Sequence, residues 1–127
     1  MPQLHEIEIG NWFLYIPNGN YCTLKSKGDI LELQGILDVY KCHVDQLASI
    51  KVTTHILSLC EFKKQTAYYS KSVKGIELSL SIKSDGAILL WHEESKKYNI
   101  RFVHQLQNVY YEVTGDKIQP NLYGVKE

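Results

Sequence analysis

The chain has 127 residues and balances 14 Lys plus Arg against 14 Asp plus Glu, so its formal net charge is zero. Hydrophobic residues make up 44% and charged residues 22%, which excludes a wholly disordered chain, a collagen-like fibre and a membrane-spanning protein. A chain of this length is expected to form a single domain, residues 1–127, with a core that needs no metal or disulfide.

The first part of the chain, residues 1–52, is predicted to be β-rich. Turn-forming residues separate short apolar or alternating segments, most clearly at Pro17-Asn18-Gly19-Asn20. Short strands with frequent turns are typical of a small barrel-like or strongly twisted antiparallel sheet. The predicted strands cover residues 7–16, 21–25, 30–33, 36–44 and 50–52.

A short helix is expected next, over residues 53–62. Thr53 and Thr54 are N-cap candidates, because a threonine hydroxyl can accept a hydrogen bond from a free amide of the first turn. Ile56, Leu59 and Cys60 then lie at helical spacing and form one apolar stripe. The polar residues that follow, 63–74, are predicted to be a loop or a frayed extension of this helix.

Residues 76–102 are predicted to form a β-meander. Ile76, Leu78, Leu80 and Ile82 alternate with polar residues, which is the clearest strand signal in the chain. Asp85-Gly86 is the preferred pair for a two-residue type I′ turn. The return strand is placed at residues 87–92, a turn at 93–97 and a third strand at 98–102.

The last predicted element is a C-terminal helix over residues 103–114. Val103, Leu106, Tyr110 and Val113 share one helical face, and Gly115 stands where a left-handed C-cap is needed. The fold class is therefore α+β: the barrel-like or twisted sheet, a short helix, a β-meander and a C-terminal helix. The alternative is one continuous sheet with both helices on one face.

The C-terminal run His104-Gln-Leu-Gln-Asn-Val-Tyr-Tyr-Glu-Val-Thr-Gly115 resembles the helix H-Q-L-Q-N-L-Y-F-A-L-T-G of short uncharacterised accessory proteins from Bacteroidetes and their prophages. Ile9-Gly10-Asn11-Trp12 is similar to the opening strand of that family. Residues 56–62 are similar to its short helix ending in C-G-F, with Glu61 replacing the glycine. The resemblance implies an accessory gene of a phage or mobile element and supplies no activity.

Catalytic and metal sites are not predicted. Cys22, Cys42 and Cys60 are an odd number without a CxxC pair, which favours buried free thiols in a reducing cytoplasm. Zinc sites usually show CxxC or HxxxH pairs, whereas here Cys42 and His43 are adjacent and His55 and Cys60 lie five residues apart, a spacing that diverges on a helix. No GxSxG, GxxxxGK[ST] or HExxH motif occurs, so the chain is expected to be no enzyme and to need no cofactor.

Two groups of residues are candidates for binding a partner or a nucleic acid. The segment 63–74 carries four lysines, no acid and two adjacent tyrosines, a composition that suits phosphates and unpaired bases. A solvated polar loop explains the same composition. The candidates here are Lys63, Lys64, Tyr68, Tyr69, Lys71 and Lys74, with Lys96, Lys97 and Arg101 as an extension if the fold brings them near.

The second group is one face of the C-terminal helix, formed by His104, Gln107 and Tyr111. Its imidazole and amide groups could face a base edge or the backbone of a partner. The alternative, which we favour, is that His104 and Gln107 pack over the rim of the sheet and bond loop carbonyls.

These observations lead to a hypothesis of function that rests on genomic analogy. The chain is expected to be a non-enzymatic phage or mobile-element protein that modulates or inhibits a machine in the bacterial cytoplasm, with a CRISPR effector as one target. The alternatives are a module that sequesters a nucleotide, RNA or single-stranded DNA, and a hydrolase or nuclease with a scattered site. No membrane contact is expected, and the neutral net charge favours a protein partner over nucleic acid.

Overall fold

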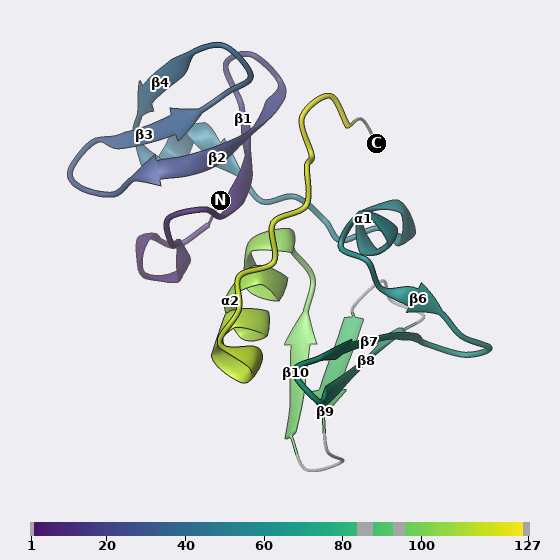
Figure 1. The fold of residues 1–127 in the computed structure, drawn as a ribbon. Helices are drawn as coiled ribbons and strands as arrows, with labels where there is room; N and C mark the ends of the chain where they lie inside the picture. Colours follow the sequence, from purple (N-terminus) through teal and green to yellow (C-terminus); the bar gives the residue numbers. More distant parts are fainter. Residues whose placement is uncertain (1, 84–87, 93–95, 126–127) are drawn as a thin grey trace. The chain divides into compact units, whose positions relative to one another are not determined.

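The computed structural model describes residues 2–83, 88–92 and 96–125. The chain divides into two compact units, unit 1 (Met1–Lys51 with Asn121–Glu127) and unit 2 (Val52–Pro120). Antiparallel strands occur in both, and the α-helices of the described residues lie in unit 2 (Figure 1), which confirms the α+β class. That residues 1–127 form a single domain stays a prediction.

Unit 1 is built on a five-stranded antiparallel sheet with the order β4-β3-β2-β1-β5. Its first four strands follow one another as hairpins, and β5 pairs with β1. The elements are η1 (Leu4–Glu6), β1 (Trp12–Tyr15), β2 (Asn20–Ser26), β3 (Leu31–Gln34), β4 (Val39–Cys42), η2 (Val44–Gln46) and β5 (Leu47–Ala48). This is the small antiparallel sheet that the turn pattern predicts.

The core of unit 1 lies on one face of this sheet. Leu31 and Leu33 of β3 are buried while the intervening residues are half-buried, as the two-residue period of a strand requires. The C-terminal tail also belongs to unit 1: Tyr123 packs edge-on against Trp12, with ring centroids 4.7 Å apart. The core residues are Ile7, Phe13, Cys22, Leu24, Leu31, Leu33, Cys42 and Leu47.

Three strand predictions in unit 1 are corrected by the structure. The predicted strand at residues 36–44 is limited to β4 at Val39–Cys42, because residues 35–38 form the β3–β4 turn and Val44 lies in η2. The fifth strand lies at Leu47–Ala48 and not at residues 50–52. After β4, only Leu47 and Ala48 pair with β1. Ile50 is buried by packing, and its burial does not require strand pairing. The first strand begins at Trp12 and not at residue 7, since Gly10 has a φ of 93°.

Unit 2 has a second five-stranded antiparallel sheet, with the order β10-β9-β8-β7-β6. Its elements are α1 (Thr54–Leu59), β6 (Lys63–Lys64), β7 (Tyr69–Val73), β8 (Ile76–Ile82), β9 (Ile88–His92), β10 (Lys96–Ile100) and α2 (Val103–Thr114). The predicted meander is present, but it begins at residue 63 and its last strand ends two residues earlier than expected. The predicted turn at Asp85-Gly86 and most of the turn at 93–97 lie outside the described residues.

The prediction of a loop over residues 63–74 is wrong. β7 pairs with β8 over five positions, from Tyr69 opposite Leu80 to Val73 opposite Ile76. Lys74 and Gly75 form the two-residue turn between them, both with positive φ, as type I′ hairpins require. The sequence of β7 lacks the apolar alternation that predicts a strand, because only Ser70 and Val73 are buried in it and Ser70 is polar.

Both helices begin where their sequences indicate, but α1 ends at Leu59 and not at residue 62, because Glu61 has a left-handed backbone. The Thr53 hydroxyl accepts a hydrogen bond from Ile56 N at 3.2 Å, which confirms it as the N-cap of α1. In α1 the structure buries Leu57 and leaves Leu59 partly exposed, contrary to the predicted stripe. Helix α2 ends at Gly115, whose φ of 76° is the left-handed C-cap conformation.

Candidate functional site

The candidate residues 63–74 form a β-hairpin in unit 2. β6 and β7 pair through Lys63 opposite Ser70 and Lys64 opposite Tyr69, and residues 65–68 connect them. Gln65 closes this connection, since its amide bonds Tyr68 O at 2.7 Å and its side chain donates to Ser70 Oγ at 3.0 Å. Tyr68 is 40% exposed at the end of the hairpin, whereas Tyr69 is half-buried.

Lys71 does not belong to the exposed surface that the sequence predicts. Its ammonium donates to the carbonyl of Cys60 at 3.0 Å and lies 5.1 Å from the ring centroid of Tyr110. The Phe62 ring is 5.9 Å away on another side. A lysine held by a carbonyl and two aromatic rings stabilises the fold, so it is a poor candidate for gripping a phosphate.

The other three lysines of the segment are exposed, and one of them has a partner. Lys74 pairs with Asp116 at 2.8 Å, an exposed ion pair that partly offsets its charge. Lys63 and Lys64 lie on β6 with exposed side chains. Two of the four lysines therefore remain as candidates for an external anion.

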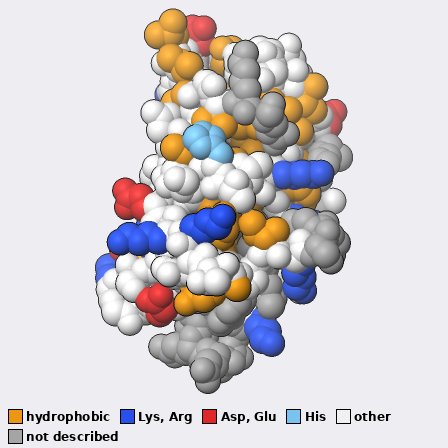
Figure 2. Space-filling view, turned by 90° about the vertical axis from the view of Figure 1, so that its right-hand side faces the viewer, with side chains coloured by type: hydrophobic (Ala, Val, Ile, Leu, Met, Phe, Trp, Pro, Cys, Tyr) orange, Lys and Arg blue, Asp and Glu red, His pale blue; other side chains and the backbone are white. Residues whose placement is uncertain are grey.

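The predicted extension of this basic segment is not adjacent to it. Lys97 lies on β10, and two strands separate β10 from β7 in the sheet, a distance of about 14 Å. Arg101 is exposed and follows β10, and Lys96 lies in the same strand. On the face shown in Figure 2, lysine and arginine side chains are scattered among acidic, hydrophobic and other side chains rather than joined into one patch.

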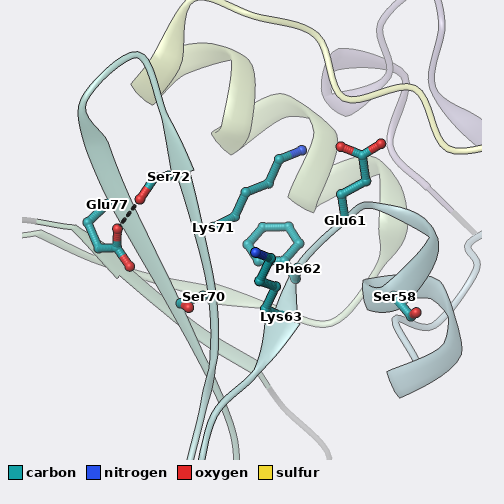
Figure 3. Close-up of a pocket in the computed structure, with 8 residues that line it drawn as sticks. All are labelled: Ser58, Glu61, Phe62, Lys63, Ser70, Lys71, Ser72 and Glu77. Atoms are coloured by element: carbon teal, nitrogen blue, oxygen red, sulfur yellow. Dashed lines mark hydrogen bonds between the residues drawn. The ribbon is translucent and has the colours of Figure 1, made fainter.

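An open pocket of about 630 Å³ lies beside this hairpin. Its lining carries both signs of charge, from two lysines and two glutamates, together with serine hydroxyls and the ring of Phe62 (Figure 3). Ser72 donates to the Glu77 carboxylate at one side of it. The lining residues are Ser58, Glu61, Phe62, Lys63, Ser70, Lys71, Ser72 and Glu77.

Glu61, which the sequence does not predict as a site residue, has a left-handed backbone at the edge of this pocket. Its φ is 67°, a conformation usually given to glycine. Helix α1 ends there in a Schellman motif, with Phe62 N bonded to Leu57 O and Glu61 N bonded to Ser58 O. The available signal was the glutamate at the glycine position of the C-G-F pattern.

The face of α2 formed by His104, Gln107 and Tyr111 is divided by the fold. His104 and Gln107 are buried, and Tyr111 is exposed. The Gln107 amide donates to Ile118 O at 3.3 Å, so this residue bonds a loop carbonyl as the alternative interpretation expects. His104 stacks on Phe102 with ring centroids 6.0 Å apart. Of the three residues, only Tyr111 has an exposed side chain.

The cysteines are free and buried. Burial raises the pKa of the Cys60 thiol to about 12, although the nearby Lys71 ammonium lowers it. A thiol with this pKa is protonated at neutral pH and is a poor nucleophile. Burial likewise raises the pKa values of Cys22 and Cys42. In the part of the chain that the structure describes, no group of three or more His, Cys, Asp or Glu side chains could hold a metal ion.

Comparison with known proteins finds no relative of this chain. The chain matches no protein-family model, no curated protein and no solved structure. Within residues 2–83, 88–92 and 96–125, none of the helices has the length and apolar character needed to cross a membrane. The resemblance to the Bacteroidetes accessory proteins stays a prediction.

Proposed function

We propose that this chain is a non-enzymatic binding protein that acts by occupying the surface of a partner protein. The observation that carries the proposal is the surface of unit 2 around the β6–β7 hairpin, where the exposed Tyr68 lies on an element that also lines a pocket of mixed charge. Tyrosines that are fixed by backbone pairing and partly exposed are typical anchors of protein interfaces.

The charge pattern supports a protein partner over nucleic acid. A single-stranded nucleic acid is held mainly by lysines that neutralise its phosphates. Here the ammonium of Lys71 is bound within the fold, Lys74 pairs with Asp116, and the carboxylates of Glu61 and Glu77 line the same pocket as Lys63. These carboxylates would repel phosphates, whereas a protein surface with both signs of charge would complement them.

The biological setting belongs to the proposal. The resemblance to Bacteroidetes accessory proteins supports an origin in a phage or mobile element. A small binding protein of such an element would work in the cytoplasm of the bacterial host and would modulate or inhibit a host machine. A host-defence nucleoprotein such as a CRISPR effector is the first target to test.

A second candidate is a module that sequesters a nucleotide or a short single strand. The volume of the pocket, about 630 Å³, suits a small ligand, and the exposed Lys63 together with the hydroxyls of Ser58 and Ser70 could bind a phosphate. This candidate predicts a strong salt dependence, which the protein-partner proposal does not.

The test is purification of the tagged chain from a Bacteroidetes host, with identification of any protein and RNA that co-purify. Tyr68→Ala should then weaken binding of the identified protein by at least tenfold, an effect typical of an interface anchor. Lys63→Ser with Lys64→Ser should change it little, as should the control pair Lys41→Ser with Lys51→Ser, two exposed lysines of unit 1. If a bare oligonucleotide binds instead, with a salt slope that flattens by about one in the Lys63/Lys64 variant alone, the nucleic-acid candidate replaces the proposal.

A further inference from the structure

The turn between β3 and β4 exposes two large aliphatic side chains. Leu37 is 89% exposed and Ile36 is 69% exposed, the two highest values among the large hydrophobic residues that the structure describes. Val39, the next apolar residue along the chain, is also exposed. Turns usually contain Gly, Pro, Asn, Asp or Ser, so two successive aliphatic residues at this place are unusual.

The backbone of this turn is held by several hydrogen bonds. Gly35 N donates to Asp38 O at 2.8 Å, which closes the turn across its base. The Gln34 side chain donates to Gly35 O at 2.9 Å and to Asp38 O at 3.5 Å. The Tyr123 hydroxyl donates to Gln34 O at 3.0 Å, from the C-terminal tail of the same unit.

The stacked rings of Tyr40 and Tyr15 pack against the backbone of this turn. A Cβ atom added to Gly35 would lie 2.9 Å from the Tyr40 ring, so the ring fits against the bare backbone there. Tyr40 in turn stacks on Tyr15, with centroids 5.0 Å apart and an interplanar angle of 28°. Ile36 and Leu37 are therefore presented on a rigid support, which lowers the entropy lost when they bind.

A third exposed aliphatic residue lies at the same end of the sheet. The antiparallel register places the β1–β2 turn and the β3–β4 turn at one end, as Figure 1 shows, and the β2–β3 turn at the other. Ile16, at the β1–β2 turn, is 54% exposed. The residues of these two turns, 16–19 and 35–38, contain one charged side chain, Asp38, and no cation.

We propose that the Ile36–Leu37 turn inserts into an apolar pocket on a partner protein, and that the rim of that pocket is basic. The two side chains supply an apolar anchor, and the carboxylate of Asp38 favours a cationic rim. The anchor goes beyond the proposed function, because it assigns a second contact element, in unit 1, that does not depend on the Tyr68 surface.

The charges favour a protein over a membrane. Proteins that bind membrane surfaces combine apolar residues with Lys or Arg, which attract anionic lipids. The two turns, residues 16–19 and 35–38, have an aspartate and no Lys or Arg, and the sequence of unit 1 carries seven carboxylates against five lysines. An anionic membrane would therefore repel unit 1.

The test places a photo-crosslinking benzoylphenylalanine at position 37 of the full chain, expressed in a Bacteroidetes host. The control places it at position 30, where Ile30 is 53% exposed at the opposite end of the sheet. We expect a discrete protein adduct from position 37 and none from position 30. The variant Ile36→Ser with Leu37→Ser should weaken binding of that protein by about 30-fold or more, and Asp38→Lys should slow its association. Ile30→Ser should leave both unchanged.

The other occupants are outcomes that overturn the proposal. These are binding of the purified chain to vesicles of phosphatidylethanolamine and phosphatidylglycerol that is lost in the double variant, a crosslink from position 37 to a second copy of the chain, and the absence of any adduct.

The inference and the proposed function can fail separately. A partner that depends on Tyr68 but gives no adduct at position 37 overturns only the inference. An adduct at position 37 whose binding is indifferent to Tyr68→Ala overturns only the site assigned to unit 2.

Discussion

Two of the hairpin turns that the structure describes, β7–β8 and β3–β4, differ in why they need a glycine. The β7–β8 turn of unit 2 consists of Lys74 and Gly75, with φ values of 52° and 80°. A two-residue turn of this type needs positive φ at both positions, and glycine meets that need without strain. The β3–β4 turn of unit 1 has its glycine at Gly35, against the Tyr40 ring, followed by Ile36 and Leu37.

The difference separates residues that the fold requires from residues that it does not. Gly75 and Gly35 are required, the first by backbone conformation and the second by lack of space. Neither backbone conformation nor lack of space requires an aliphatic residue at Ile36 or Leu37, because their side chains lie mostly in solvent. Exposed aliphatic side chains on a hydrogen-bonded turn that gain little from folding are the basis of the apolar anchor proposed above.

The largest expected effect contrasts two leucines at the extremes of burial. Leu106 of α2 is 1% exposed and Leu37 is 89% exposed. Leu106→Ala should lower the free energy of unfolding by about 2–5 kcal/mol, through lost burial and the cavity left behind. Leu37→Ala should change it by no more than about 0.5 kcal/mol. Urea titrations of both variants measure the difference, and a large loss for Leu37→Ala would show that this turn is part of a core.

Gly35→Ala should have the next largest effect. The new methyl group would meet the Tyr40 ring at 2.9 Å and force it to move, at a cost of about 1–3 kcal/mol. If space is the cause, the cost should shrink when Tyr40→Leu is combined with it, and a double-mutant cycle by thermal unfolding measures that coupling. Strictly additive effects would contradict the steric explanation.

Glu61→Gly should raise stability, and Gly75→Ala should lower it, each by about 1 kcal/mol. Both residues have positive φ, at 67° and 80°, and they differ in whether glycine is present. No atom lies within 4 Å of a Cβ added to Gly75, so its cost would come from the backbone alone. Chemical denaturation measures both. A Glu61→Gly variant that unfolds more easily would mean that the glutamate side chain supports the fold.

The smallest effect is expected from Lys74→Ala. The ion pair with Asp116 is exposed, and such pairs contribute about 0–0.5 kcal/mol. The loss should vanish at high salt, where screening is complete. Melting temperatures of the variant and the parent at low and high salt give the measurement, and a difference that persists at high salt would point to a role of Lys74 beyond its charge.

Much of the secondary structure follows from local signals. The apolar face of Val103, Leu106 and Tyr110 and the cap at Gly115 predicted α2 with its observed bounds. The alternation from Ile76 to Ile82 predicted β8 in the same way. These predictions succeed because the periodicity of a helix or strand and the capping of a helix depend on residues a few positions apart.

The candidate site was less accessible to sequence reasoning. The composition of residues 63–74 indicates Tyr68 and Lys63 as binding residues, and both are exposed on one hairpin in the structure. The same composition indicates Lys71, but its ammonium contacts Cys60 and Tyr110, which are distant from it in the sequence. No local pattern shows which lysine of a basic segment will bend inward to a carbonyl and two rings.

The sequence by itself determined the α+β class, the presence of the two helices, most strands and the turn at residues 17–20, since these depend on propensities and periodicities within short windows. The tertiary structure decided that residues 63–74 pair as strands, that β5 lies at Leu47–Ala48 and that Gln107 bonds a loop carbonyl. It also decided that Ile36 and Leu37 are exposed while other aliphatic residues of unit 1 are buried. Burial and hydrogen-bond partners depend on residues brought together from distant positions, so they become visible only when the chain is folded.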